Sequence, residues 1–179
     1  MKLKNLFILV GAPGSGKSYW ATKRIKEIDK GNAMHISRDK VRFALISEDE
    51  EYFSREPIVY KTWIAAIQAA IDSKAANTDN IYVDATNLSV ARRKELFENI
   101  DLPNRKNNVN INIVYFCTDV ITCMKRNANR EGRENVPNMV IRRMYNSIEI
   151  PKEDELMGTL GIKYTNIYEV LPIEPVKEE

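Results

Sequence analysis

The sequence predicts an α/β fold in which a parallel sheet of about five strands carries helices on both faces. Short apolar segments bounded by turn residues alternate with longer segments of helical periodicity along the chain. The first apolar segment leads through a glycine-rich loop into a helical segment. The 179 residues suit a single domain over 1–179, and residues 172–179, with prolines and charges, are expected to form a flexible tail.

Five apolar segments are predicted as strands: residues 4–10, 33–37, 80–85, 109–117 and 165–170. Helical segments separate them. Parallel neighbours need a crossover connection, so the alternation favours a parallel sheet over an antiparallel one.

Three helices are predicted most clearly, over residues 19–29, 57–74 and 137–148. Gly31 ends the first, and Pro137 lies in the first turn of the third. Apolar residues at helical spacing mark the core-facing sides of the second and third: Val59, Trp63, Ala66, Ile67 and Ala70, then Val140, Ile141, Met144, Tyr145 and Ile148.

The glycine-rich loop reads Gly11-Ala12-Pro13-Gly14-Ser15-Gly16-Lys17-Ser18, which matches G-x-x-x-x-G-K-[ST] in full. Such a loop points successive backbone N–H groups at phosphate oxygens, with the helix start adding positive charge. Lys17 would reach the β- and γ-phosphates of ATP, and Ser18 would offer its hydroxyl to Mg²⁺. The predicted nucleotide-binding residues are Gly11, Pro13, Gly14, Ser15, Gly16, Lys17 and Ser18. The loop therefore predicts an ATP-binding P-loop phosphotransferase.

The second predicted strand is followed by Ser37-Arg38-Asp39-Lys40-Val41-Arg42. The carboxyl ends of parallel strands share one edge of the sheet, so this segment is expected beside the phosphate loop. If Ser37 caps a helix, Asp39 and Arg42 share one face: a carboxylate able to accept a hydroxyl proton beside a guanidinium able to grip a phosphate. The alternative is ordinary helix-start chemistry with an exposed Arg42.

The third predicted strand ends in Asp84, a carboxylate suited to the Mg²⁺ shell, to orienting the acceptor or to structure alone. The following Thr86, Asn87 and Ser89 can cap a helix. The lone histidine, His35, is read as a strand residue rather than a catalyst.

Beyond the fourth strand, Arg126, Arg130 and Arg133 follow one another at spacings of four and three, which predicts one side of a helix just before Pro137. A movable arginine lid of this kind can place positive charge over a transferring phosphate. The alternative is a solvated basic face, the interpretation given to the run from Arg92 to Lys94.

In this order, the phosphate loop, Arg38-Asp39-Lys40-Val41-Arg42, Asp84-Ala85-Thr86-Asn87 and Arg126-Asn127-Ala128-Asn129-Arg130 resemble the kinase domain of phage and bacterial 5'-hydroxyl polynucleotide kinases over residues 6–148. The resemblance implies that Asp39 is the general base on the 5'-hydroxyl, Arg42 holds the acceptor strand's phosphate, and Arg130 contacts the ATP phosphates. Many relatives carry a fused 3'-phosphatase with a D-x-D-x-T motif. The sequence lacks that motif, so a kinase without a phosphatase domain is expected.

Two other functions stay open on the sequence: a P-loop kinase of the same build acting on a small-molecule hydroxyl, such as a nucleoside, an antibiotic or a nucleotide sugar, and a nucleotide-dependent switch without chemistry. The net charge of +2 argues against wholesale capture of long duplex DNA but permits a local basic groove. DNA against RNA and the oligomeric state, a homo-oligomer included, are also open.

No apolar run approaches the roughly 20 residues of a membrane span, so no membrane partner is expected. Cys117 and Cys123 are too few for a disulfide framework, which predicts buried free thiols in a reducing cytoplasm.

Overall fold

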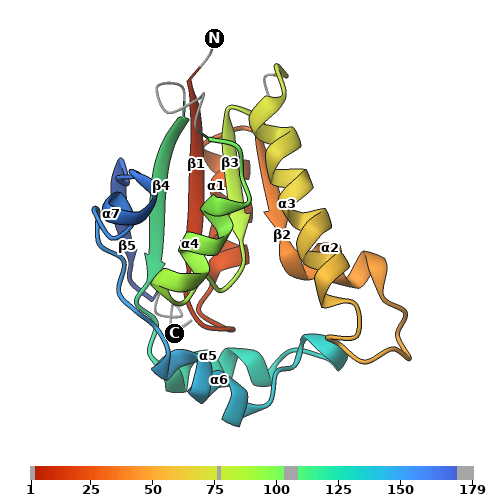
Figure 1. Ribbon diagram of the computed structural model, residues 1–179. Helices are drawn as coiled ribbons and strands as arrows, with labels where there is room; N and C mark the ends of the chain where they lie inside the picture. The colour runs from red at the N-terminus through yellow and green to blue at the C-terminus, as the bar shows by residue number, and fades with distance from the viewer. Residues whose placement is uncertain (1–2, 76–77, 103–108, 173–179) are drawn as a thin grey trace.

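The sheet has five strands, all paired in parallel in the order β2-β3-β1-β4-β5, in a computed structural model that describes residues 3–75, 78–102 and 109–172 (Figure 1). The strands are β1 (Lys4–Val10), β2 (Ala33–Ser37), β3 (Asn80–Asp84), β4 (Val109–Phe116) and β5 (Asn166–Val170). The predicted fold class and all five predicted strands are confirmed, with bounds within one residue. Most of the predicted tail lies outside the described residues.

The central strand β1 supplies core residues to both faces of the sheet, because successive side chains of a strand point in opposite directions. Leu6, Ile8 and Val10 join one buried cluster, whereas Phe7 and Leu9 join another. A strand buried on both faces explains why this segment of the sequence is apolar without alternation.

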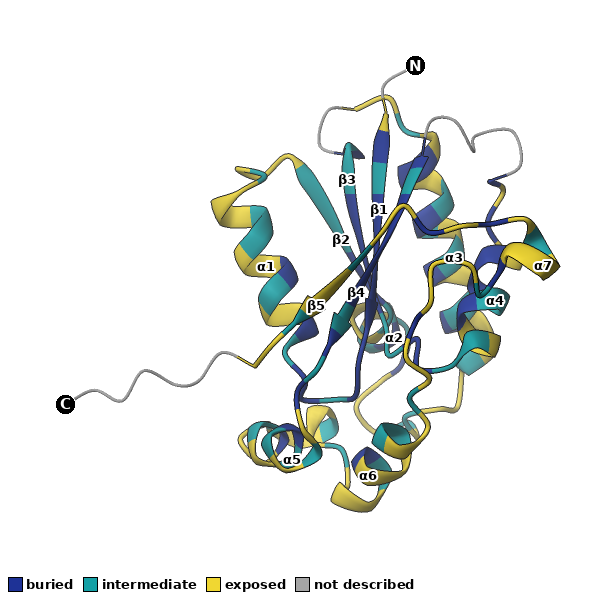
Figure 2. Ribbon diagram, turned by 90° about the vertical axis from the view of Figure 1, so that its left-hand side faces the viewer, coloured by how far each residue is buried: buried dark blue, intermediate teal, exposed yellow. Residues whose placement is uncertain are grey.

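Helices cover both faces, as Figure 2 shows edge-on: α1 (Lys17–Glu27) lies on one side of the sheet, and α3 (Glu56–Asp72) and α4 (Val90–Glu98) lie on the other. The apolar stripe of α3 packs into the larger cluster, in which Trp63 donates from its indole N–H to the carbonyl of Ile36 at 3.2 Å. The stripe predicted for residues 57–74 is therefore core. Of the stripe predicted for residues 137–148, Ile141 is buried, Tyr145 and Ile148 pack beside it, and Val140 and Met144 are only partly buried.

The remaining helices are α2 (Arg38–Leu45), α5 (Val120–Ala128), α6 (Asn138–Asn146) and the short α7 (Met157–Leu160). In Figure 1, α5 and α6 lie beyond the ends of the strand arrows, so they face the carboxyl edge of the sheet. The predicted helix bounds need small corrections: α1 starts at Lys17, α3 spans Glu56–Asp72, and Pro137 is the N-cap of α6 rather than a residue of its first turn.

Successive connections lead from the middle of the sheet toward opposite edges. The connection from β1 leads to β2 at one edge, whereas the connection from β3 leads to β4 in the other half of the sheet. A crevice at the carboxyl ends of the strands opens where the order reverses, and ligands of such sheets bind there. No helix among residues 3–75, 78–102 and 109–172 combines the length and apolar character needed to cross a membrane.

Two predictions about single residues are wrong. Arg93 was assigned to a solvated basic face but is 0% exposed, and its guanidinium pairs with Glu155 at 2.5 and 2.8 Å while donating to the carbonyls of Asn87 and Glu149. Of the two free cysteines, Cys123 is buried as expected, whereas Cys117 is only partly buried.

Burial would raise the pKa of Glu155, but hydrogen bonds from Arg93 and Tyr164 outweigh burial and hold that pKa below its usual range. Glu155 therefore stays ionised beside Arg93. This buried ion pair joins α4 to the segment that follows α6, on the face of the sheet opposite α1.

Replacing Arg93 should cost far more stability than replacing its neighbour Arg92. Arg93→Ala leaves the Glu155 carboxylate buried without its cation, and breaking such a pair costs about 3–5 kcal/mol. Arg92 pairs with Glu95 on the surface, so Arg92→Ala should change the free energy of unfolding by less than about 0.5 kcal/mol. Urea denaturation of both variants measures the difference, and equal losses would contradict the structural role given to Arg93.

Candidate active site

The phosphate loop, residues 11–18, connects β1 to α1 at the carboxyl edge of the sheet. Gly14 and Gly16 have φ angles of +81° and +101°, which favour glycine. A Cβ atom on Gly14 would lie 2.2 Å from the carbonyl oxygen of Cys123 in α5. The loop is thus pressed against α5, and its curvature is the one required to turn N–H groups toward an anion.

Lys17 lines the cleft but is buried, and its ammonium group donates to the carbonyl oxygens of Gly11 at 2.8 Å and Ala12 at 2.9 Å. Burial lowers the pKa of Lys17, although the negative charges of Asp84 and Asp39 oppose that shift. The Lys17 ammonium group therefore links the end of the phosphate loop to two carbonyl oxygens at its start. The charges of both carboxylates act on it, which places all three predicted residues in one site.

The Asp84 carboxylate accepts hydrogen bonds at Oδ2 from the Ser18 hydroxyl at 2.6 Å and from Nε2 of His35 at 2.8 Å. Burial alone would raise the pKa of Asp84, but the bonds from His35 and Ser18 and the charge of Lys17 outweigh it and lower the pKa. Asp84 is therefore ionised at neutral pH. His35 is a strand residue, as predicted, but its hydrogen bond to Asp84 is not predictable from the sequence.

This pairing of a hydroxyl with a carboxylate fits Mg²⁺, which takes one or two protein oxygens and completes its shell with water and substrate phosphates. No cluster of three or more His, Cys, Asp or Glu side chains that could hold a metal occurs in the described part of the chain. The oxygens of Ser18 and Asp84 could thus hold the ion only together with a nucleotide's phosphates.

Asp39 reaches the site because α2 begins where β2 ends. Ser37 is the last residue of β2 and the N-cap of α2, and its hydroxyl accepts from the N–H of Lys40. Asp39 lies in the first turn, where the helix dipole favours a negative charge. Its side chain is 62% exposed, so the carboxylate is accessible from the cleft it lines.

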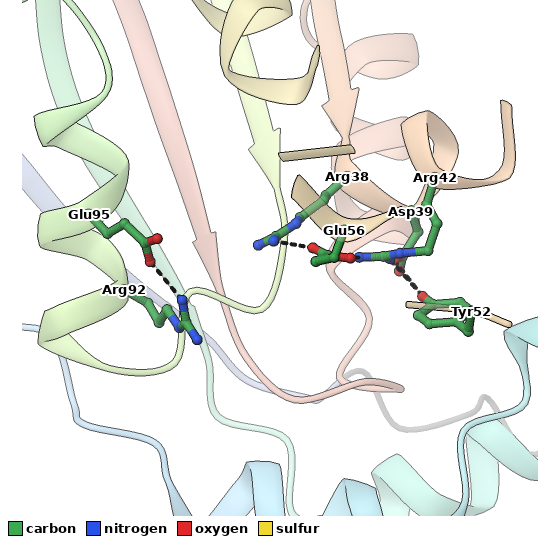
Figure 3. Close-up of polar contacts among 7 residues, drawn as sticks. All are labelled: Arg38, Asp39, Arg42, Tyr52, Glu56, Arg92 and Glu95. Carbon is green, nitrogen blue, oxygen red and sulfur yellow. Dashed lines mark hydrogen bonds and ion pairs between the residues drawn. The ribbon is translucent and has the colours of Figure 1, made fainter. Parts of the chain in front are cut away.

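Arg42 shares a helix face with Asp39, as predicted, but it is only 4% exposed (Figure 3). Its guanidinium pairs with the carboxylates of Asp39 and Glu56 and donates to the Tyr52 hydroxyl at 2.8 Å. Burial and the Asp39 charge raise the pKa of Tyr52, so its phenol keeps the proton that it donates to Asp39 at 2.7 Å. The exposed Arg42 of the alternative interpretation is excluded.

The three predicted lid arginines do not share one helix. Arg126 lies in the last turn of α5 and donates to the carbonyl of Ser15 at 3.5 Å. Arg130 follows the end of that helix, and Arg133 lies in the 3₁₀ turn η2 (Gly132–Glu134). The prediction of a single helical face is therefore wrong. The helix ends at Ala128, so the spacing of the arginines beyond it does not place them on a common helix face.

Two contacts instead fasten the segment 129–136, which we call the strap, across the mouth of the cleft. The buried Asn127 side chain bonds the N–H of Val136 at 3.0 Å and its carbonyl at 2.7 Å, which closes the strap at its base. Arg133 donates to the carbonyl of Ser47 at 2.8 Å, just beyond α2, and lies over the ring of Phe43. Figure 1 shows the strap reaching from α5 toward that segment.

The cleft under the strap has a volume of about 1460 Å³, more than the roughly 300–1,000 Å³ typical of small-molecule sites. It is lined by the phosphate loop, the start of α2 and the strap. Lys17, Asp39, Asp84 and Arg130 all face it, and the charge of Arg130 acts on Lys17. The structure thus brings the residues predicted for catalysis and for the metal into one cleft, whereas Gly11 and Ser15 of the phosphate loop do not line it.

The fold and the loop together define a P-loop nucleotide-binding domain of the kinase type. Residues 6–151 match the family model described as an AAA domain. The chain belongs to this family of P-loop domains.

Solved structures with the same fold include a chain of an RNA repair complex, an RNA kinase and a gluconokinase. A chain of the Pnkp1/Rnl/Hen1 RNA repair complex is 25% identical with a TM-score of 0.63, over 82% of this chain but only 44% of that one. A fungal RNA kinase is 13% identical with a TM-score of 0.62, over 100% of this chain and 78% of its own. A gluconokinase from Sinorhizobium meliloti 1021 is 16% identical with a TM-score of 0.56, over 98% and 86%.

Asp84→Asn should weaken metal binding while preserving the shape of the site. Removing one metal-orienting carboxylate typically costs about 10- to 100-fold in metal affinity, so the Mg²⁺ concentration for half-maximal nucleotide turnover should rise by that factor. The exposed Asp101, changed to Asn, is the matched control. An unchanged Mg²⁺ requirement in Asp84→Asn would remove Asp84 from the metal site.

Proposed function

We propose that this protein is a polynucleotide kinase that transfers the γ-phosphoryl group of ATP to the 5'-hydroxyl of DNA or RNA, with Mg²⁺ as cofactor. The observation that carries the proposal is the single cleft in which the phosphate loop, Asp39 and Arg42 meet. An RNA kinase and a chain of an RNA repair complex among the structures that share this fold support it.

In this proposal the cleft has a donor half and an acceptor half. The phosphate loop with Lys17 would bind the β- and γ-phosphates of ATP, and Ser18 and Asp84 would hold Mg²⁺, which would neutralise phosphate charge. Arg126 and Arg130 approach the phosphates from the side of the strap. Asp39 and Arg42, at the start of α2, serve the acceptor.

The reaction forms one bond and breaks one. The acceptor's hydroxyl oxygen bonds to the γ-phosphorus, the bond from that phosphorus to the β,γ-bridging oxygen breaks, and ADP leaves with the electron pair. The hydroxyl proton goes to Asp39. Arg42 and Tyr52 both donate to Oδ1 of this carboxylate, so Oδ2 is the oxygen that would accept the proton.

A small-molecule kinase is the second candidate. Each acceptor-side arginine is already paired with a carboxylate, Arg38 and Arg42 with Glu56 and Arg92 with Glu95. This half of the cleft is therefore less basic than a long phosphate backbone would favour. The gluconokinase with the same fold supports this second candidate.

An acceptor panel distinguishes the two candidates. With radiolabelled ATP, we expect label on 5'-hydroxyl DNA or RNA oligonucleotides and little on nucleosides, sugar acids or 5'-phosphorylated strands. The 5'-phosphorylated strand is the control, because it lacks only the attacking hydroxyl. Label on a small molecule but on no oligonucleotide would favour the second candidate, and ADP release with no acceptor labelled would point to a switch.

Asp39→Asn should lower kcat by about 10²- to 10⁴-fold with little change in the KM for ATP. Asparagine keeps the size and the hydrogen-bond acceptor of the side chain but does not take a proton. Asp49→Asn, an exposed aspartate of the same region, is the control. An Asp39→Asn enzyme with normal kcat would contradict the role of Asp39 as the base.

A further inference from the structure

The Glu56 carboxylate lies between two guanidinium groups in the acceptor half of the cleft, as Figure 3 shows. Its Oε1 accepts from Nη2 of Arg38, and its Oε2 accepts from Nη2 of Arg42 at 2.7 Å. One side-chain anion thus occupies the position between two arginines that both line the cleft.

Aromatic rings hold both arginines independently of Glu56. The guanidinium carbon of Arg38 lies 4.9 Å from the centre of the Tyr60 ring and 5.6 Å from that of Trp63. That of Arg42 lies 4.4 Å from the centre of the Tyr52 ring. Because stacking on a ring fixes a planar guanidinium, the pair should keep its arrangement when Glu56 moves away.

The carboxylate leaves part of this site unsatisfied. Among the described residues, four buried side-chain atoms lack a hydrogen-bond partner, and all four belong to residues that line the cleft: Nε of Arg38, Nε of Arg42, Oε2 of Glu50 and Oη of Tyr60. Buried donors without partners are rare and often mark the place of a ligand. A phosphate offers more oxygens to two arginine forks than a carboxylate does.

Glu56 lies in the first turn of α3, where the helix dipole favours a negative charge. The backbone N–H groups of Glu56 and Ile58 already donate to the carbonyls of Phe53 and Arg55, and Pro57 has no N–H. The two arginines are therefore the groups that can bind an anion at the point that the Glu56 carboxylate now occupies.

We propose that Glu56 occupies the acceptor's phosphate site in the ligand-free protein, that Arg38 and Arg42 together bind that phosphate, and that acceptor binding displaces Glu56. The inference rests on the proposed role of Arg42 and adds Arg38 and Glu56 to it. Arg42, 4% exposed, is inaccessible to a ligand while Glu56 stays in place. Displacement thus favours acceptors that carry a phosphate next to the reacting hydroxyl, since a bare alcohol has no charge to exchange for the carboxylate.

The test is a binding measurement that needs no turnover. Calorimetry is done with saturating Mg²⁺ and ADP, so that the phosphate loop is filled, and the ligands are adenosine and adenosine 3'-monophosphate. Glu56→Gln should bind the 3'-monophosphate about 10-fold more tightly than the unmodified protein, because a competing internal anion lowers apparent affinity. The affinity for adenosine should not change.

Matched variants separate displacement from general effects. Glu153→Gln removes a carboxylate that is paired with a cation outside the cleft, Lys163 at 3.4 Å, and should change neither affinity. Arg38→Ala in the Glu56→Gln background should abolish the gain. Glu56→Asp keeps the charge on a shorter side chain and should give a smaller gain, which preserves the test if the glutamine variant does not fold.

Equal or weaker binding of the 3'-monophosphate by both Glu56 variants would overturn the inference, and so would a gain that survives the loss of Arg38. These outcomes differ from a failure of the proposed function. If no 5'-hydroxyl strand is phosphorylated but the gain appears, the phosphate site stands and only the polymeric acceptor is lost. If strands are phosphorylated and no gain appears, the kinase stands without the displacement.

Discussion

The contact between the phosphate loop and α5 sets the geometry on which the remainder of the cleft depends. The Gly14 backbone approaches the Cys123 carbonyl so closely that no side chain fits between them. The Thr118 hydroxyl, at the junction of β4 and α5, donates to the carbonyl of Ser15 at 2.9 Å. Because β4 pairs directly with β1, the sheet itself positions α5 beside the loop, and with it the base of the strap.

The sequence predicts the fold well because the signals of the fold are local. Apolar strands, a complete phosphate-loop motif and the Ser37 cap each depend on a few neighbouring residues. The positions of the two site carboxylates are predicted for the same reason. Asp84 ends one strand and Asp39 follows another, both at the carboxyl edge of the sheet. The arginine spacing misleads because nothing in it reveals that α5 ends at Ala128.

The partners of these residues could not be predicted, since they come from distant parts of the chain. His35 reaches Asp84 only because β2 and β3 are paired, and Glu56 reaches Arg42 only because α3 packs on α2. Arg93 shows the same limit in the core: its charge indicates a surface residue, and only its Glu155 partner, 62 positions away, makes burial acceptable.

The direct junction of β2 with α2 makes Asp39 a rigid extension of the sheet. No linker separates strand from helix, so each residue added there would rotate α2 by about 100° and shift it by about 1.5 Å. A single insertion would therefore turn Asp39 out of the cleft without unfolding the protein. The segment 46–55 beyond α2 carries no helix or strand, but Ser47 accepts from Arg133 of the strap, and Tyr52 is bonded to both Asp39 and Arg42. Diversification of this chain, by evolution or by library design, should thus keep constant both the β2–α2 spacing and the length of the segment that follows α2.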